Sequence, residues 1–163
     1  MQNSNIKKKI ITLIGPTASG KTSTAIHLIK KIPISIIGVD SVQIYKRFNI
    51  GSAKPPKEIL EKYNHHLVDC VDPENIFSVK DFYDQAYEIV TQEHSNNRIP
   101  LLVGGTMMYF NALFKGINDI PEGNEAIREE LQQELDKRGV DKLFNELKEI
   151  DPESAKTIKE NDK

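Results

Sequence analysis

The sequence has little cysteine, little net charge and no long apolar run. Cys70 is the only cysteine among the 163 residues, which excludes an internal disulfide and a cysteine-based zinc site, and we expect it to be a small core residue. The formal net charge of -2 excludes a global basic field, although a local basic cleft would vanish in that sum. No apolar run approaches the length of a membrane span. The basic stretch Lys7–Lys9 leads directly into a strand pattern, unlike a secretory signal, so we expect a cytoplasmic protein.

A phosphate-binding motif near the start organises the chain. Residues 15–22 match the P-loop pattern G-x-x-x-x-G-K-[ST]. An apolar strand pattern at 9–14 precedes the motif, and apolar residues at helical spacing follow it. This context disfavours a chance glycine-rich turn and predicts that a phosphate or diphosphate binds here. The predicted binding residues are Gly15, Pro16, Thr17, Ala18, Ser19, Gly20, Lys21 and Thr22.

The residue types of the motif suit an anion. Gly15 and Gly20 permit backbone conformations that a β-carbon would obstruct, so that several N–H groups turn inward to form a nest. The helix that starts near Lys21 adds the positive end of its dipole. Lys21 supplies a mobile positive charge for the outer phosphate, and Thr22 offers a hydroxyl to a magnesium ion.

Asp40 follows the second strand pattern, at 34–39. A carboxylate just past the end of a strand lies at the ligand edge of an open α/β sheet, so we expect Asp40 on the same edge as the P-loop. It is a candidate general base or indirect metal ligand. It is equally a candidate helix cap or turn residue, because Asp-Ser is favourable capping chemistry. The spacing leaves both interpretations open.

Strand patterns at 9–14, 34–39, weakly 65–69, and 99–103 alternate with helical patterns. They predict an α/β fold in which a parallel sheet of the P-loop NTPase type is flanked by helices. The last strand ends in Gly104-Gly105, where a Walker B strand carries an acid, which favours an enzyme that uses its loop for the phosphates of a substrate. Thr106 is predicted to cap the next helix. So few strands indicate an incomplete domain.

The composition changes after Pro121, where charged helical patterns begin. Asn124 and Asp151 are predicted N-caps, with Pro152 at the first helical position, and Gly139 is a predicted helix end. We expect residues 1–120 to form part of a P-loop catalytic core and 121–163 to begin an α-helical insertion subdomain. His65 and His66 are adjacent and would face opposite sides of a strand, so we expect structural roles for them instead of metal binding.

Several stretches together resemble one family, the tRNA dimethylallyltransferases, also called tRNA isopentenyltransferases. The P-loop alone is shared by many families, but the ordered set is specific and covers nearly the whole chain. Ser52 stands where the family usually has Thr. The matching stretches are 15–22, 40–45, 50–55, 65–69, 104–109, 151–152 and 161–162.

The resemblance implies transfer of a dimethylallyl group from dimethylallyl diphosphate to N6 of the adenosine adjacent to the anticodon in tRNA, with Mg2+ as cofactor. The P-loop would hold the donor's diphosphate, and the target adenine would leave the stack of the anticodon loop. The implied catalytic residues are Asp40 as general base, Thr17 on the oxygen that bridges carbon and phosphorus, and Lys21. The implied tRNA-binding residues are Asp40, Ser41, Val42, Gln43, Thr106 and Arg128.

Members of this family are longer, and their further residues include a basic tRNA-contacting segment and a catalytic arginine. We therefore expect the chain to be an N-terminal portion, monomeric, with little activity by itself. The alternative function is a P-loop small-molecule kinase. Such kinases usually carry paired arginines in a lid, whereas the arginines here are scattered, at 47, 98, 128 and 138.

Overall fold

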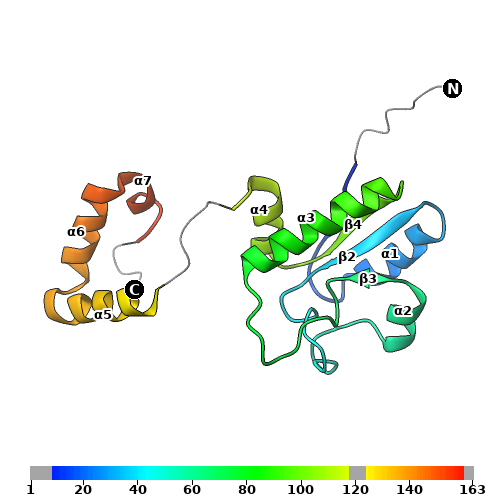
Figure 1. Ribbon diagram of the computed structural model, residues 1–163, viewed down its shortest axis with the longest axis horizontal. Helices are drawn as coiled ribbons and strands as arrows, with labels where there is room; N and C mark the ends of the chain where they lie inside the picture. Colours follow the sequence, from blue (N-terminus) through cyan, green and yellow to red (C-terminus); the bar gives the residue numbers. More distant parts are fainter. Residues whose placement is uncertain (1–8, 118–123, 160–163) are drawn as a thin grey trace. The chain divides into compact units, whose positions relative to one another are not determined.

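The computed structural model describes residues 9–117 and 124–159. The chain divides into two compact units, Met1–Asn118 and Asp119–Lys163, which are described separately (Figure 1). The predicted boundary at 120/121 lies outside the described residues.

The first unit contains a four-stranded sheet in the order β1-β4-β2-β3, in which every pair is parallel. The predicted parallel α/β fold is therefore confirmed. Two strands are shorter than predicted, because β1 begins its pairing with β4 only at Ile11, and Leu67 turns the chain out of β3 with a φ of 56°. The strands are β1 (Ile11–Ile14), β2 (Ile34–Val39), β3 (His65–His66) and β4 (Ile99–Gly104).

Helices cover both faces of this sheet (Figure 1). On β2, Ile34 and Ile36 pack towards α1 (Lys21–Ile29), whereas Ile37 and Val39 face α3 (Val79–Ser95) and α4 (Met107–Lys115). This alternation follows from the two-residue period of a strand. Because both faces are covered, every residue of β2 is buried, which explains its continuous apolar sequence. The short α2 (Lys57–Lys62) lies between β2 and β3 in the chain.

Local signals set the helix ends of this unit. The Ser78 hydroxyl accepts a hydrogen bond from the Asp81 amide, and the Asp81 carboxylate accepts from the Ser78 amide, so a capping box forms at the start of α3. The Ser78 hydroxyl also donates to the Asp81 carboxylate at 2.6 Å, and this bond first, then the bond from the Ser78 amide, lower the pKa of Asp81. Gly116 ends α4 with a φ of 81°. The expectation for Cys70 is wrong, since it is exposed.

The second unit consists of α5 (Glu125–Arg138), α6 (Val140–Ile150) and α7 (Pro152–Ala155). Its predicted caps form: Asn124 accepts from the Ala126 amide, and Asp151 accepts from the Ser154 amide with Pro152 at the first position. Gly139 separates α5 from α6 with a φ of 81°. In the part of the chain that the structure describes, no helix combines the length and apolarity needed to cross a membrane.

Three strand ends converge at the carboxyl edge of the sheet. Ile14 of β1 and Val39 of β2 both pair with Gly104, the last residue of the central strand β4. After this edge β1 leads to α1 on one face, and β4 leads to α4 on the other face. Neighbouring parallel strands whose connections leave to opposite faces open a crevice, which is where open α/β sheets bind ligands.

Gly104 permits this convergence. A β-carbon at this position would lie 2.0 Å from the carbonyl oxygen of Val39. The same carbonyl accepts hydrogen bonds from the amides of Gly105 and Thr106, each at 3.2 Å. The Gly15 amide also donates to the carbonyl of Gly104 at 3.4 Å. An acidic side chain of the Walker B kind therefore has no room at position 104.

Gly104→Ala is expected to lower the free energy of unfolding by about 3 kcal/mol or more, because the new methyl group must displace backbone of β2. Gly51→Ala is the control. Gly51 also has a positive φ, of 78°, but nothing lies within 4 Å of its added β-carbon, so its cost is the conformational one alone. That cost is about 1 kcal/mol. Urea unfolding of both variants measures the difference, and equal losses would contradict the close-approach argument.

Candidate active site

The P-loop adopts the conformation of an anion nest. Gly20 has a φ of 83°, as predicted, and Ala18 has a φ of 63°, a left-handed conformation that the sequence did not reveal. Successive backbone units of this kind turn their N–H groups towards one point. At Gly15 an added β-carbon would lie 3.0 Å from the Ser19 hydroxyl, a tight contact that this side chain would have to relieve by moving a few tenths of an ångström. The Lys21 ammonium donates to the carbonyls of Gly15 at 2.8 Å and Pro16 at 2.6 Å, which fixes its side chain across the loop.

A first cleft, of about 350 Å³, lies over this loop. We name it the phosphate cleft. Its floor is the P-loop and the first turn of α1, where unpaired amides and the helix dipole favour an anion. Its walls come from the ends of β2 and β4 and from the loop after β2. The lining residues are Thr17, Ala18, Ser19, Gly20, Lys21, Thr22, Ser23, Asp40, Gln43, Ala53, Val103, Gly104 and Gly105.

Asp40 lies at the predicted edge, beside the P-loop. Its Oδ1 accepts hydrogen bonds from the amides of Val42 at 2.9 Å and Gln43 at 3.1 Å, so the turn-forming role is real. No described residue donates a hydrogen bond to its Oδ2 in the structure of 9–117 and 124–159. One oxygen thus fixes the carboxylate in place and the other is left for chemistry. The two interpretations of Asp40 are compatible.

A second cleft, of about 490 Å³, shares the lining residues Thr17, Asp40 and Gly105 with the first. We name it the acceptor cleft. It combines apolar surface with the hydroxyls of Thr17, Ser41 and Thr106. Thr17 and Asp40 line both clefts, so these two side chains lie where the clefts adjoin. The lining residues are Ile14, Gly15, Pro16, Thr17, Asp40, Ser41, Gly105, Thr106 and Met107.

Thr106 corrects one expectation. It occupies the N-cap position of α4, but its side chain makes no capping hydrogen bond. Its hydroxyl oxygen accepts instead from the Ser41 amide at 3.0 Å, and the hydroxyl lies 3.4 Å from that of Ser41. The side chain thus joins the turn after β4 to the turn after β2, two segments far apart in the sequence.

Tyr109 supports the site from the core. Its ring stacks on Phe82 with centroids 4.1 Å apart, and it is 3% exposed. Burial above all, and then the nearby Tyr45, Asp40 and Asp81, raise the pKa of the Tyr109 hydroxyl. Tyr109 therefore stays protonated and serves packing.

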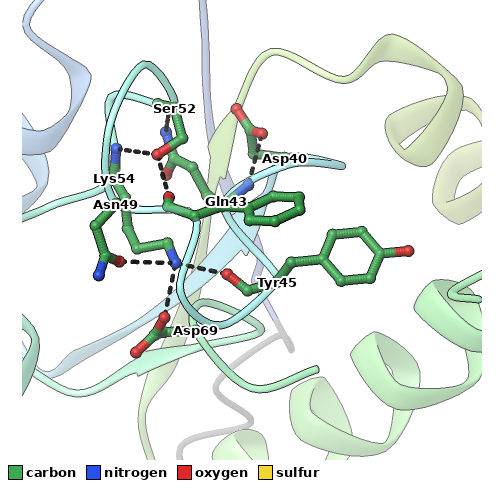
Figure 2. Close-up of polar contacts among 8 residues, drawn as sticks. Asp40, Gln43, Tyr45, Asn49, Ser52, Lys54 and Asp69 are labelled. Carbon is green, nitrogen blue, oxygen red and sulfur yellow. Dashed lines mark hydrogen bonds and ion pairs between the residues drawn. The ribbon is translucent and has the colours of Figure 1, made fainter. Parts of the chain in front are cut away.

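The loop from Ser41 to Pro56 is held by polar contacts that sequence reasoning did not anticipate (Figure 2). The Gln43 amide group donates to the carbonyls of Ser52 at 3.1 Å and Ala53 at 3.2 Å. Lys54 pairs with Asp69 at 2.6 Å. These residues lie in three separate stretches, 40–45, 50–55 and 65–69, and only the fold brings them together. Gln43, a predicted tRNA-binding residue, therefore also shapes the loop through its side-chain amide.

The remaining predicted residues, Val42 and Arg128, line neither cleft, and the two adjacent histidines have other partners. Val42 is 45% exposed beside the site, and Arg128 lies on α5 in the second unit, so its tRNA contact stays a prediction. His66 bonds to the Ser35 hydroxyl at 3.0 Å, and His65 bonds to the Tyr63 carbonyl, which fits structural roles. Burial, above all, lowers the pKa of His65. Among the described residues no group of three His, Cys, Asp or Glu side chains could hold a metal ion.

Residues 43–163 match the model of the IPP transferase family. The chain is 44% identical over 153 residues to a tRNA dimethylallyltransferase of Dichelobacter nodosus, an alignment that covers 94% of this chain and 48% of that protein. It spans about half the length of the curated relatives it matches.

Solved structures agree with these sequence matches. A full-length tRNA isopentenylpyrophosphate transferase from Bacillus halodurans has a TM-score of 0.66 at 39% identity, with 96% of this chain and 52% of that chain covered. A eukaryotic dimethylallyltransferase acting on tRNA has a TM-score of 0.76 at 29% identity, with 94% and 38% covered. The likeness thus includes the fold of the whole described sheet.

Thr106→Val is expected to lower the free energy of unfolding by about 1 kcal/mol, because it leaves the Ser41 amide without its acceptor at nearly unchanged volume. Thr106→Ser keeps the hydroxyl and is expected to cost less. Urea unfolding compares the two variants. If the valine variant is as stable as the parent, the hydroxyl does not join the two turns.

Proposed function

The chain belongs to the IPP transferase family, and from this premise we propose that the complete product of its gene is a tRNA dimethylallyltransferase. In this proposal, a dimethylallyl group moves from dimethylallyl diphosphate to N6 of the adenosine adjacent to the anticodon, and diphosphate is released. The observation that supports it most is that Thr17 and Asp40 line both clefts. A donor in one cleft and an acceptor in the other would meet there.

The phosphate cleft suits the leaving group. Lys21, the loop amides and the start of α1 would bind the diphosphate and stabilise the charge that grows as its bond to carbon breaks. Thr17 lies at the border of the two clefts, where its hydroxyl can donate to the oxygen that bridges carbon and phosphorus. The positive floor of the cleft therefore lies where the departing electron pair would go.

The acceptor cleft suits the adenine. The bond from N6 to the allylic carbon forms as the bond from that carbon to oxygen breaks, and the proton of N6 passes to Oδ2 of Asp40. Because Oδ1 is held by two amides, the carboxylate is oriented before the adenine arrives. An exocyclic amine is a weak nucleophile, so this orientation matters as much as basicity. Ser41 and Thr106 add hydroxyls beside the adenine.

In this proposal the phosphate cleft also holds magnesium. Thr22 and Asp40 both line it, and hydroxyl and carboxylate oxygens are the ligands that Mg2+ prefers, together with water and substrate phosphates. Thr22 would hold the ion, with Asp40 as an indirect ligand. When bound, the ion would neutralise part of the diphosphate charge.

The kinase alternative has less support. The matched relatives are named for prenyl transfer to tRNA, and none of the matches reported above is named as a kinase. Arg47 and Arg138 pair with Glu74 and Glu134, so in this chain they serve ion pairs. A monomeric state and a cytoplasmic location remain predictions.

The proposal is tested by incubating the complete gene product with radiolabelled dimethylallyl diphosphate and unmodified tRNA, with and without Mg2+. We expect label in the tRNA, less of it without Mg2+, and release of diphosphate in equal amount. A folded protein that binds ATP and phosphorylates a small acceptor, but leaves the tRNA unlabelled, would refute the proposal.

Two variants separate the roles of the clefts. Asp40→Asn is expected to lower the rate of transfer about 100-fold or more, because the proton acceptor is lost, while the affinity for inorganic diphosphate changes little. Lys21→Met is expected to weaken diphosphate binding itself, as isothermal titration calorimetry would measure. Asp72→Asn, an exposed carboxylate of the same unit, is the control and should change neither quantity. If Asp40→Asn transfers at the parent's rate, Asp40 is not the base.

A further inference from the structure

Lys54 is a buried cation in a loop. Its side chain is 3% exposed, and its ammonium donates to the Tyr45 carbonyl at 2.5 Å, the Asn49 side chain at 3.3 Å and the Asp69 carboxylate at 2.6 Å. Figure 2 shows the ammonium at the centre of these three acceptors. An ammonium has three donors, so all are used. Lys54 therefore has no donor left for a substrate phosphate.

The other cations of this loop are different. Lys46 pairs with Asp72 at 3.2 Å, and the two side chains are 43% and 51% exposed. Arg47 pairs with Glu74, and these side chains are 65% and 69% exposed. Exposed pairs contribute little to stability, because water and salt screen them. By contrast, the charge of the Lys54 ammonium is removed from water, and losing one of its partners would be costly in free energy. The ammonium and its three acceptors therefore hold one another in place.

The backbone around Lys54 is strained. Arg47, Ala53 and Asp69 have φ values of 65°, 54° and 56°, in the left-handed region that favours glycine. Such conformations cost of order 1 kcal/mol each and persist where the surroundings determine them. Two of the three lie directly at the ammonium: Ala53 precedes Lys54, and Asp69 pairs with it. Lys54 is thus directly next to two of the three left-handed residues, Ala53 and Asp69.

This arrangement continues to the site. The Gln43 side chain donates to the carbonyls of Ser52 and Ala53, the two residues before Lys54. The Gln43 amide in turn donates to Oδ1 of Asp40 at 3.1 Å. Gln43 and Ala53 also form part of the wall of the phosphate cleft. An unbroken series of contacts therefore leads from Lys54 through Ala53 and Gln43 to Asp40.

We infer that Lys54 is a positioning residue of the active site. It fixes the loop wall formed by Gln43 and Ala53, and through Gln43 it orients the carboxylate of Asp40. It does not touch the substrate, because its three donors are used within the loop. As a statement about catalysis this inference rests on the proposed function, whereas its structural part, the order of the Asp40 turn, does not.

Lys54→Met tests the inference, because it removes the ammonium and keeps much of the side chain's length. In the complete gene product, kcat for transfer is expected to fall about tenfold or more, since small misplacements of a catalytic group are costly. The Kd for inorganic diphosphate is expected to stay within about twofold, because the P-loop itself is untouched. Lys46→Met is the matched control, a cation of the same loop in an exposed pair, and should leave both values unchanged.

Hydrogen exchange gives a readout that is independent of activity. The amides of Val42 and Gln43 both donate to Asp40, so their exchange rates report the order of its turn. NMR is expected to show faster exchange at these amides in Lys54→Met but not in Lys46→Met. If Lys54→Met does not fold, Asn49→Ala removes only the longest of the three contacts and should give a smaller change of the same kind.

The outcomes are distinguishable. Unchanged exchange at Val42 and Gln43 in a folded Lys54→Met variant would overturn the inference. So would a loss of diphosphate affinity in parallel with kcat, which indicates a general structural role. A parent protein that transfers no prenyl group would refute the proposed function alone, and the exchange rates would still decide whether Lys54 orders the Asp40 turn.

Discussion

The carbonyl oxygen of Val39 is the point on which the site depends. It accepts hydrogen bonds from two consecutive amides, those of Gly105 and Thr106, and this is possible because Gly104 has no side chain. The contact brings the end of β2 to the end of β4, while β4 also pairs with the strand that leads into the P-loop. The P-loop and Asp40, which are 18 to 25 residues apart in the sequence, become neighbours for this reason.

This convergence explains how a P-loop can serve a group transfer without a Walker B acid. The position where that acid would stand is filled by backbone, so the carboxylate of the site comes from the end of β2 instead. Asp40 then faces the border between the phosphate cleft and the acceptor cleft. The chemistry that we propose depends on that placement. The P-loop amides would stabilise the charge of the departing diphosphate, and Asp40 would accept the proton.

The features that sequence reasoning predicted are local ones. The P-loop and the caps at Asn124 and Asp151 each depend on residues within a few positions, and all are present. The position of Asp40 followed from the rule that parallel strands end at one edge. The partners of Lys54 and Thr106 could not be predicted, because they lie in separate stretches of the sequence and nothing in those stretches tells which side chains meet in the fold. Cys70 was misplaced because a single residue carries no pattern.

The most direct test of the account is a crystal structure of the complete gene product with dimethylallyl S-thiolodiphosphate, a donor analogue whose carbon–sulfur bond resists cleavage. The account predicts that both phosphorus atoms lie in the phosphate cleft, against Lys21 and the loop amides, and that the allylic carbon faces Thr17 and Asp40. A diphosphate bound away from the P-loop, or an allylic carbon that faces away from Asp40, would contradict it.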